Sequence, residues 1–139
     1  MELQKFRIAH STLIEHYQFI ECHLEGIYAA VSQKELQDSF RDVEKGSLND
    51  VVREIKRLER QQKIRIFTPE EYEALYGIFQ RRNFWCHSCY CELSFDMETG
   101  GPARVRDVKQ MLEDMEVAEQ WRDRLFEKKV RLLKENEKI

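Results

Sequence analysis

Apolar side chains recur along residues 3–31 in alternating steps of three and four residues. The stripe consists of Leu3, Phe6, His10, Leu13, Tyr17, Ile20, Leu24, Ile27 and Val31. Because this spacing keeps one face of a helix apolar, it predicts a single unbroken α-helix over these residues. Such a helix spans roughly 40 Å at 1.5 Å per residue. It can hardly bury its stripe alone, so it needs partner helices.

The segment that follows contains the signals of two shorter helices. Three apolar residues at helical spacing predict the first over residues 34–44. Gly46 can end this helix, and Ser47 can cap the next one, which ends near Gln62. Residues 64–67 then alternate apolar and polar positions in an extended piece that is too short for a sheet.

A strong helix start stands at Thr68-Pro69-Glu70-Glu71. Thr68 can cap the helix, Pro69 suits the first helical position, and Glu71 completes a capping box. This helix is predicted to fade near Phe95. A loop over residues 96–102 follows it, because that stretch contains two consecutive glycines.

A second long helix is predicted to begin at Pro102 and to run to the basic C-terminal end, which complements the helix dipole. Its apolar face consists of Val105, Val108, Met111, Leu112, Met115, Ala118, Trp121 and Leu125. We find no repeat, no low-complexity tract and no linker. Residues 1–139 are therefore predicted to form a single all-α domain, a bundle of about five helices with long first and last members.

Composition narrows the class of protein further. Hydrophobic residues make up 42% and charged residues 35%, which suits a soluble helical protein. The net charge of −3 gives no general electrostatic case for nucleic-acid binding, so any such binding has to be local. Four cysteines without a signal peptide or membrane span favour reduced thiols and a cytoplasmic location.

Residues 81–91 concentrate the chemistry of the chain and read Arg-Arg-Asn-Phe-Trp-Cys-His-Ser-Cys-Tyr-Cys. At the 100° per residue of an α-helix, one side carries Asn83, His87 and Tyr90. A neighbouring stripe carries Arg82, Cys86 and Cys89. Arg82 and His87 then lie about 140° apart around the axis. The motif is therefore expected to form a rim between a core face and a polar face.

These residue types suit a phosphodiester substrate. His87 can take up or release a proton near neutral pH, and Arg82 can hold a phosphate and stabilise charge on its oxygens. Asn83 can orient the imidazole or a ribose hydroxyl. No metal is required when the nucleophile is the ribose 2′-hydroxyl of RNA. One imidazole cannot act as base and acid in the same step, so a homodimer that pairs two copies of His87 is favoured.

The run from Arg82 to His87 resembles the signature of the HEPN superfamily, in which an Arg and then an Asn, Asp or His precede a His by fixed spacing. Many prokaryotic toxin and anti-phage ribonucleases belong to it.

The resemblance implies a helical bundle with the motif late in the fourth helix. It implies Arg82 and His87 as catalytic pair and Asn83 as polar partner, in a homodimer-interface cleft that cuts RNA without metal or other cofactor. A cognate antitoxin or a nucleotidyltransferase would be a partner protein.

Two neighbours of the motif are further candidates for substrate binding, and two alternatives stay open. Arg81 fits a looser spacing to His87, and Tyr90 lies one position beyond the Tyr of some HEPN members, where this chain has Cys89. In the first alternative, the Arg is buried against a carboxylate and the His is hydrogen-bonded within the bundle. In the second, a non-catalytic module binds a nucleotide, an RNA or a protein partner.

The other histidines and the cysteines are interpreted as packing or surface residues rather than as parts of a site. Cys86 and Cys89 have zinc-like spacing, but a closed site needs two more ligands, so packing is favoured and no metal site is predicted. His10 is expected to be a satisfied core histidine, and His16 and His23 to be surface or interface residues. The basic stretch is expected to be a solvated helix face, with phosphate steering as the alternative; it consists of Arg53, Lys56, Arg57, Arg60 and Lys63.

Overall fold

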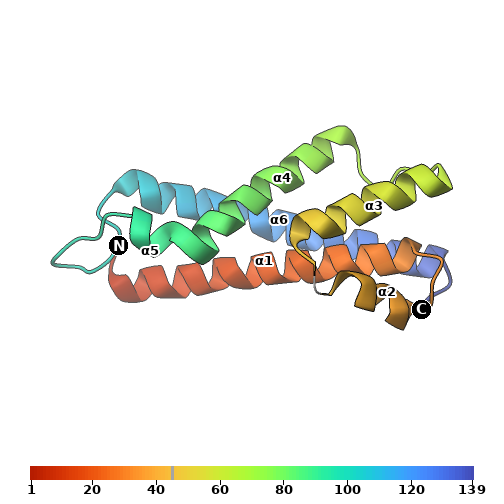
Figure 1. The fold of residues 1–139 in the computed structure, drawn as a ribbon. Coiled ribbons are helices and arrows are strands. Elements are labelled where there is room, and N and C mark those ends of the chain that lie inside the picture. The colour runs from red at the N-terminus through yellow and green to blue at the C-terminus, as the bar shows by residue number, and fades with distance from the viewer. Residues whose placement is uncertain (45) are drawn as a thin grey trace.

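Two long parallel helices run through the protein. The computed structural model describes residues 1–44 and 46–139, and the regular elements within them are helices. Helices α1 (Leu3–Val31) and α6 (Val105–Glu135) lie side by side and point in the same direction (Figure 1). The prediction of an all-α bundle is confirmed, and the bounds of α1 coincide with the apolar stripe.

The core lies along the facing stripes of these two helices. On α1, Leu13, Ile20 and Leu24 are fully buried, and on α6 Met111 and Ala118 are fully buried. Removal of a Leu or Ile side chain from water stabilises the fold by about 1.5–3 kcal/mol. The stripe that predicted a long helix is thus also the surface that fixes its partner.

The outward face of α6 is largely charged, whereas that of α1 is mostly uncharged and polar, and both carry scattered apolar side chains. Ile8 and Phe19 on α1, and Leu112 and Phe126 on α6, are exposed. Within the described ranges, no helix is both long and apolar enough to cross a membrane.

Two shorter helices pack against α1 (Figure 1). These are α2 (Leu36–Val43) and α3 (Leu48–Gln62). The predicted cap of α3 is present, because Ser47 Oγ accepts a hydrogen bond from the Asp50 amide at 3.2 Å. The Asp50 carboxylate accepts one in return from the Ser47 amide at 3.0 Å. The start of α3 is therefore encoded by residues 47–50.

The connection between α3 and α4 joins no sheet and bends at Ile66 and Phe67, where an extended piece was predicted. The Glu59 carboxylate accepts hydrogen bonds from the amides of Ile66 at 2.7 Å and Phe67 at 3.1 Å. Its other oxygen accepts a hydrogen bond from the Tyr72 hydroxyl at 2.6 Å. One side chain thus satisfies the amides that a neighbouring strand would otherwise pair.

Helix α4 (Pro69–Asn83) runs antiparallel to the two long helices (Figure 1). Thr68 Oγ1 accepts a hydrogen bond from the Glu71 amide at 3.1 Å, and Glu71 Oε1 accepts one from the Thr68 amide at 2.9 Å. Pro69 occupies the first turn, as predicted. The helix carries the Arg-Asn motif to its C-terminal end, where Arg82 contacts Glu21 near the middle of α1.

The helix beyond Asn83 is not the continuous α-helix that we predicted. A π-helical turn, η1 (Phe84–Ser88), leads into a single turn, α5 (Cys89–Glu92). The regular structure thus ends at Glu92 rather than near Phe95. Angles calculated at 100° per residue therefore do not hold across the motif.

The start of α6 also differs from the prediction, because Pro102 remains in the preceding loop. Pro102 is buried and forms an isolated antiparallel bridge with Phe95. The Asp96 amide donates to the Gly101 carbonyl at 2.8 Å. Gly101 lies so close to the Met1 backbone that a Cβ would collide with the Met1 carbonyl. These contacts hold the loop in place, so the helix begins only at Val105.

Candidate functional site

The π-helical turn governs the geometry of the Arg-Asn-His motif. In a π-helix the hydrogen bonds join residues five apart, whereas an α-helix joins residues four apart. Arg82 lies in α4, two residues before this wider turn, and His87 lies within the turn, five residues after Arg82. The angle between their side chains around the axis therefore differs from the about 140° that an ideal α-helix gives for two residues five apart. Such turns are rare and frequently occur at functional sites.

Arg82 lies between the end of α4 and the middle of α1. Its guanidinium is 3.5 Å from the Glu21 carboxylate, and both side chains are partly exposed. Nη1 also donates a long hydrogen bond to Asn83 Oδ1 at 3.4 Å. Ion pairs that remain in contact with water contribute only about 0–1 kcal/mol. The contact with Glu21 therefore adds little to the stability of the fold.

His87 projects from the π turn into solvent. Its side chain is exposed, as is that of Asn83. In the part of the chain that the structure describes, no hydrogen bond holds the imidazole to Arg82 or Asn83. The structure thus brings Arg82 and Asn83 into contact and leaves His87 nearby but separate.

Tyr90 combines packing with exposure. Its ring stacks on Phe95 at 5.8 Å between centroids and meets Phe6 edge-on at 5.7 Å. About half of the side chain, 52%, nevertheless remains exposed. The aromatic contacts fix the ring, and its role in substrate binding stays a prediction.

Arg81 forms an ion pair with a buried carboxylate, whereas its neighbour Arg82 pairs with a partly exposed one. Its Nε donates to Asp114 Oδ2 at 2.7 Å, and the Trp85 indole donates to the same oxygen at 2.7 Å. Gln110 Nε2 donates to the other oxygen at 2.9 Å. The alternative of an Arg held by a buried carboxylate thus describes Arg81. Its substrate-binding role stays a prediction.

Asp114 was not among the residues that sequence reasoning singled out. It is 8% exposed, which is unusual for a carboxylate. The signal that could have revealed it is its position, because it lies three residues after Met111 and four before Ala118 on the apolar face of α6. An acid on such a face usually has a buried partner.

Tyr17 of α1 lies near this buried carboxylate. Burial, and then the negative charge of Asp114, raise the pKa of the Tyr17 phenol well above its usual value. The phenol therefore stays protonated at neutral pH. Tyr17 is suited to packing rather than to service as a base.

His10 is satisfied inside the bundle, as expected. Its Nε2 donates to the Trp85 carbonyl, within the π turn, at 2.7 Å. Its ring also stacks against Phe6 at 5.8 Å. A histidine on α1 thus holds the backbone of the turn that carries His87.

The expectation that His16 and His23 are surface or interface residues is wrong, because α6 of the same chain covers both. Both are buried, with exposed fractions of 9% and 5%. Arg122 donates to His16 Nδ1 at 3.2 Å, and Lys129 donates to His23 Nδ1 at 3.1 Å. Because α1 and α6 are parallel, the same contact recurs seven residues further along both helices, and α6 covers both rings. Burial, with the Lys129 charge, lowers the pKa of His23 to about 4.

The cysteines differ in burial rather than forming a cluster. Cys89 is buried and Cys86 is half-buried, whereas Cys22 and Cys91 are exposed. Burial raises the pKa of both the Cys86 and the Cys89 thiol, so each stays protonated at neutral pH. Among residues 1–44 and 46–139, no group of three or more His, Cys, Asp or Glu residues is arranged to hold a metal ion.

The basic stretch of α3 is largely occupied by local partners. Arg53 pairs with Asp50 at 3.1 Å, and Arg57 pairs with Glu54 at 2.8 Å. Lys56 donates to the Tyr76 hydroxyl at 2.7 Å. These contacts agree with a solvated helix face.

Comparisons of the chain with models of protein families, with curated proteins and with solved structures give no match.

Proposed function

We propose that this protein is a HEPN-like, metal-independent endoribonuclease whose site is the rim formed by Arg82, Asn83 and His87. The observation that carries the proposal is an exposed His87 within the π turn, five residues after Arg82, whose guanidinium is 3.5 Å from the partly exposed Glu21 carboxylate. A base and a phosphate-binding cation five residues apart are accessible from solvent on the same segment.

The chemistry follows from what these groups do. His87 takes the proton of a ribose 2′-hydroxyl, whose oxygen attacks the adjacent phosphorus. The bond from phosphorus to the 5′-oxygen breaks, and that oxygen receives a proton. Arg82 binds the phosphoryl oxygens as negative charge builds on them, and Asn83 positions the ribose or the imidazole. The products carry a 2′,3′-cyclic phosphate and a 5′-hydroxyl.

A homodimer completes this scheme. One imidazole cannot be both base and acid in the same step, so we propose that a second copy of His87 protonates the leaving oxygen. A twofold axis near the π turn would place the two histidines on opposite sides of the phosphate, because a C2 interface repeats the same contacts on both subunits. The exposed positions of Asn83 and His87 support such a face.

Cleavage of RNA in the presence of EDTA tests the activity. The parent protein should cut single-stranded RNA and leave 2′,3′-cyclic ends, whereas His87→Ala and Arg82→Gln should lose at least about a hundredfold in rate. Cys91→Ser, at another exposed position of the same segment, is the matched control and should cut normally. Cleavage that survives both site substitutions would refute the assigned roles.

The same experiment separates the nuclease from a binding module. A parent protein that binds RNA through Arg82 but never cuts it would instead be a non-catalytic HEPN-like module. Size measurements on the parent and on Asn83→Arg, which places extra charge on the proposed twofold face, test the homodimer. We expect the variant to be monomeric and inactive.

We further propose that the protein acts in the cytoplasm as a toxin or an anti-phage nuclease, restrained by a separate antitoxin or nucleotidyltransferase. This rests on the resemblance of the Arg82–His87 run. Induced expression should arrest growth, and His87→Ala should relieve the arrest. Equal toxicity of both proteins would contradict this context.

A further inference from the structure

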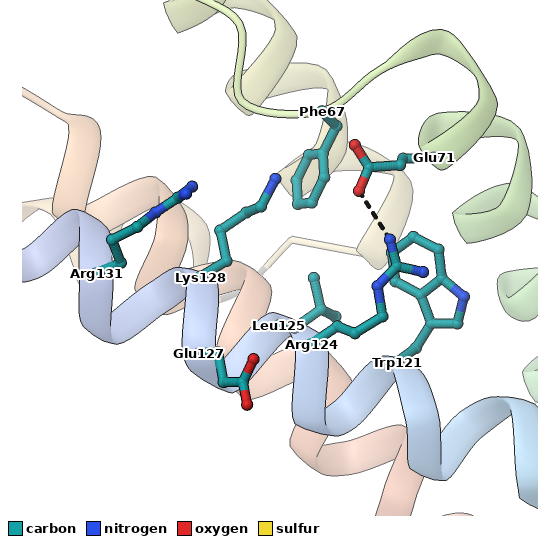
Figure 2. A pocket seen from close by; sticks show the side chains of 8 residues that line it. All are labelled: Phe67, Glu71, Trp121, Arg124, Leu125, Glu127, Lys128 and Arg131. Atoms are coloured by element: carbon teal, nitrogen blue, oxygen red, sulfur yellow. Dashed lines mark hydrogen bonds and ion pairs between the residues drawn. The ribbon is translucent and has the colours of Figure 1, made fainter.

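A pocket lies at the opposite end of α4 from the Arg-Asn-His rim. It opens between the start of α4 and the C-terminal half of α6 and has a volume of about 290 Å³ (Figure 2). The 15 residues of α4 separate the two places by roughly 20 Å at 1.5 Å per residue. The pocket is therefore distinct from the proposed nuclease site.

Three cations of α6 project into this pocket. Arg124, Lys128 and Arg131 follow one another at spacings of four and three residues, which places them on one side of the helix. Figure 2 shows all three side chains rising from α6 on the side that faces Phe67. The helix thus presents a short row of positive charge.

Two of these cations are held on aromatic rings. The Arg124 guanidinium lies 4.2 Å from the centre of the Trp121 ring, and Lys128 Nζ lies 4.4 Å from the centre of the Phe67 ring. Both rings are buried, with exposed fractions of 7% and 2%. Lys128 also donates to the Ile66 carbonyl. The charges are therefore positioned before any ligand arrives.

Carboxylates pair with two of the three cations, but one of these pairs is loose and exposed: Arg131 Nε lies 3.8 Å from Glu135 Oε1, and both side chains are about 60% exposed. Glu71 accepts a hydrogen bond from Arg124 at 3.1 Å while its other oxygen caps α4. Figure 2 shows the Glu127 carboxylate turned away from Phe67. In the described part of the chain, Lys128 forms no ion pair, and burial together with Arg131 and Arg124 lowers the pKa of its ammonium despite the nearby Glu71. A bound anion would offset that cost.

We propose that this pocket binds a phosphate monoester. The dianionic phosphate sits between Lys128 and Arg131, within reach of Arg124, which matches the preference of guanidinium and ammonium groups for phosphate oxygens. The organic part rests on the apolar floor near Leu125. The pocket volume of about 290 Å³ is close to the smallest volumes of small-molecule sites. The pocket can therefore hold a small organic group in addition to the phosphate.

Three sources share this chemistry: a mononucleotide, a sugar phosphate and the phosphorylated end of an RNA strand. The inference does not rest on RNA cleavage, because the pocket and the rim use different residues. A protein that binds phosphate monoesters but does not cut RNA would support this inference and contradict the proposed nuclease. A protein that cuts RNA but binds no phosphate monoester would do the reverse.

Calorimetric titration of the full chain tests the proposal. Probes are AMP, adenosine, glucose 6-phosphate, inorganic phosphate, and one oligoribonucleotide with either a 5′-phosphate or a 5′-hydroxyl. We expect AMP or the phosphorylated oligonucleotide to bind at least about tenfold more tightly than its unphosphorylated counterpart. Preference for AMP and glucose 6-phosphate identifies a small-molecule ligand, and preference for the phosphorylated oligonucleotide alone identifies an RNA end.

Substitutions assign any binding to the pocket. Lys128→Met keeps the aliphatic contact with Phe67 but removes the charge, and Arg131→Gln alters a side chain that is 61% exposed. Each should weaken binding about tenfold, whereas Arg53→Gln on α3 should not. Because Arg131 is exposed, its variant tests the proposal even when Lys128→Met fails to fold. Equal binding of AMP and adenosine, unaltered binding by Arg131→Gln, or no binding of any phosphate monoester at about 1 mM would overturn it.

Discussion

The indole nitrogen of Trp85 donates a hydrogen bond to the Asp114 carboxylate at 2.7 Å, across 29 residues of sequence. Trp85 lies inside the π turn, and Asp114 lies on the buried face of α6. This contact joins the segment that carries His87 to one of the two long helices. The position of the rim therefore depends on a buried carboxylate that is not itself part of the rim.

Replacement of this carboxylate should destabilise the fold. Asp114→Ala leaves the Trp85 indole without its acceptor and Arg81 without its counter-charge, so we expect the free energy of unfolding to fall by about 3 kcal/mol. Denaturant unfolding measures the loss. Glu113→Ala, at the exposed neighbouring position, should change stability by less than about 0.5 kcal/mol. Similar stabilities for the two variants would show that the contact contributes little.

Substitution of Arg81 should affect mainly stability, whereas substitution of Arg82 should affect mainly RNA cleavage. Arg81→Gln should lower stability by about 2 kcal/mol, because it removes the cation that pairs with the buried Asp114 carboxylate. Arg82→Gln should alter stability by less than about 1 kcal/mol, since its partner Glu21 is partly exposed, but should abolish RNA cleavage. Thermal unfolding and cleavage assays on both proteins provide the comparison. If Arg81→Gln abolished cleavage and Arg82→Gln lowered stability, Arg81 would be the catalytic arginine and Arg82 the structural one.

The π turn should matter for activity more than for folding. Deletion of Ser88 removes one residue from the five of η1, so the segment can close as an ordinary α-helix and His87 moves around the axis. We expect retained helical content by circular dichroism and a loss of about a hundredfold in cleavage, because small displacements of catalytic groups are costly. Ser88→Ala keeps the turn and should keep the activity. Full activity of the deletion protein would exclude a role for the turn.

Stability should depend on His23 as the pH falls. The pKa of His23 is about 4 in the folded protein, below its ordinary value of 6.5, because burial and Lys129 disfavour the charged ring. The unfolded chain thus binds more protons between these two values, and the free energy of unfolding decreases as the pH falls from 6.5 to 4. This residue should account for up to about 3 kcal/mol of the decrease.

The variant His23→Asn isolates this contribution. Its amide oxygen can accept the Lys129 hydrogen bond but does not titrate, so we expect a shallower loss of stability over the same pH window. Cys22→Ser, at the exposed neighbouring position, should keep the parent slope. Identical slopes for the parent and His23→Asn would show that the loss arises from other groups.

Removal of Glu21 should strengthen RNA binding. The Glu21 carboxylate, 3.5 Å from Arg82, competes with a phosphate for the guanidinium. In a His87→Ala background, which prevents cleavage, Glu21→Gln should tighten binding about two- to fivefold, the range expected for a partly exposed pair. Fluorescence anisotropy measures the change. Glu15→Gln removes a carboxylate near Arg122 instead and should have no effect.

Local sequence signals determined most of the helix boundaries. The capping boxes at Ser47–Asp50 and Thr68–Glu71 are made by residues three apart, so their hydrogen bonds follow from the sequence without knowledge of the fold. The stripe of α1 likewise specified a helix from Leu3 to Val31. By contrast, the start of α6 depended on a loop held against Met1, which no local pattern reveals.

For the candidate site, the sequence alone determined which residue types stand at which spacing, and hence the Arg-Asn-His motif. The tertiary structure decided its geometry, because partners distant in sequence hold the π turn: His10 binds the Trp85 carbonyl and Asp114 binds the Trp85 indole. It also decided which arginine pairs with a buried carboxylate. Arg81 and Arg82 are chemically identical neighbours, and the positions of Asp114 on α6 and Glu21 on α1 give them different partners.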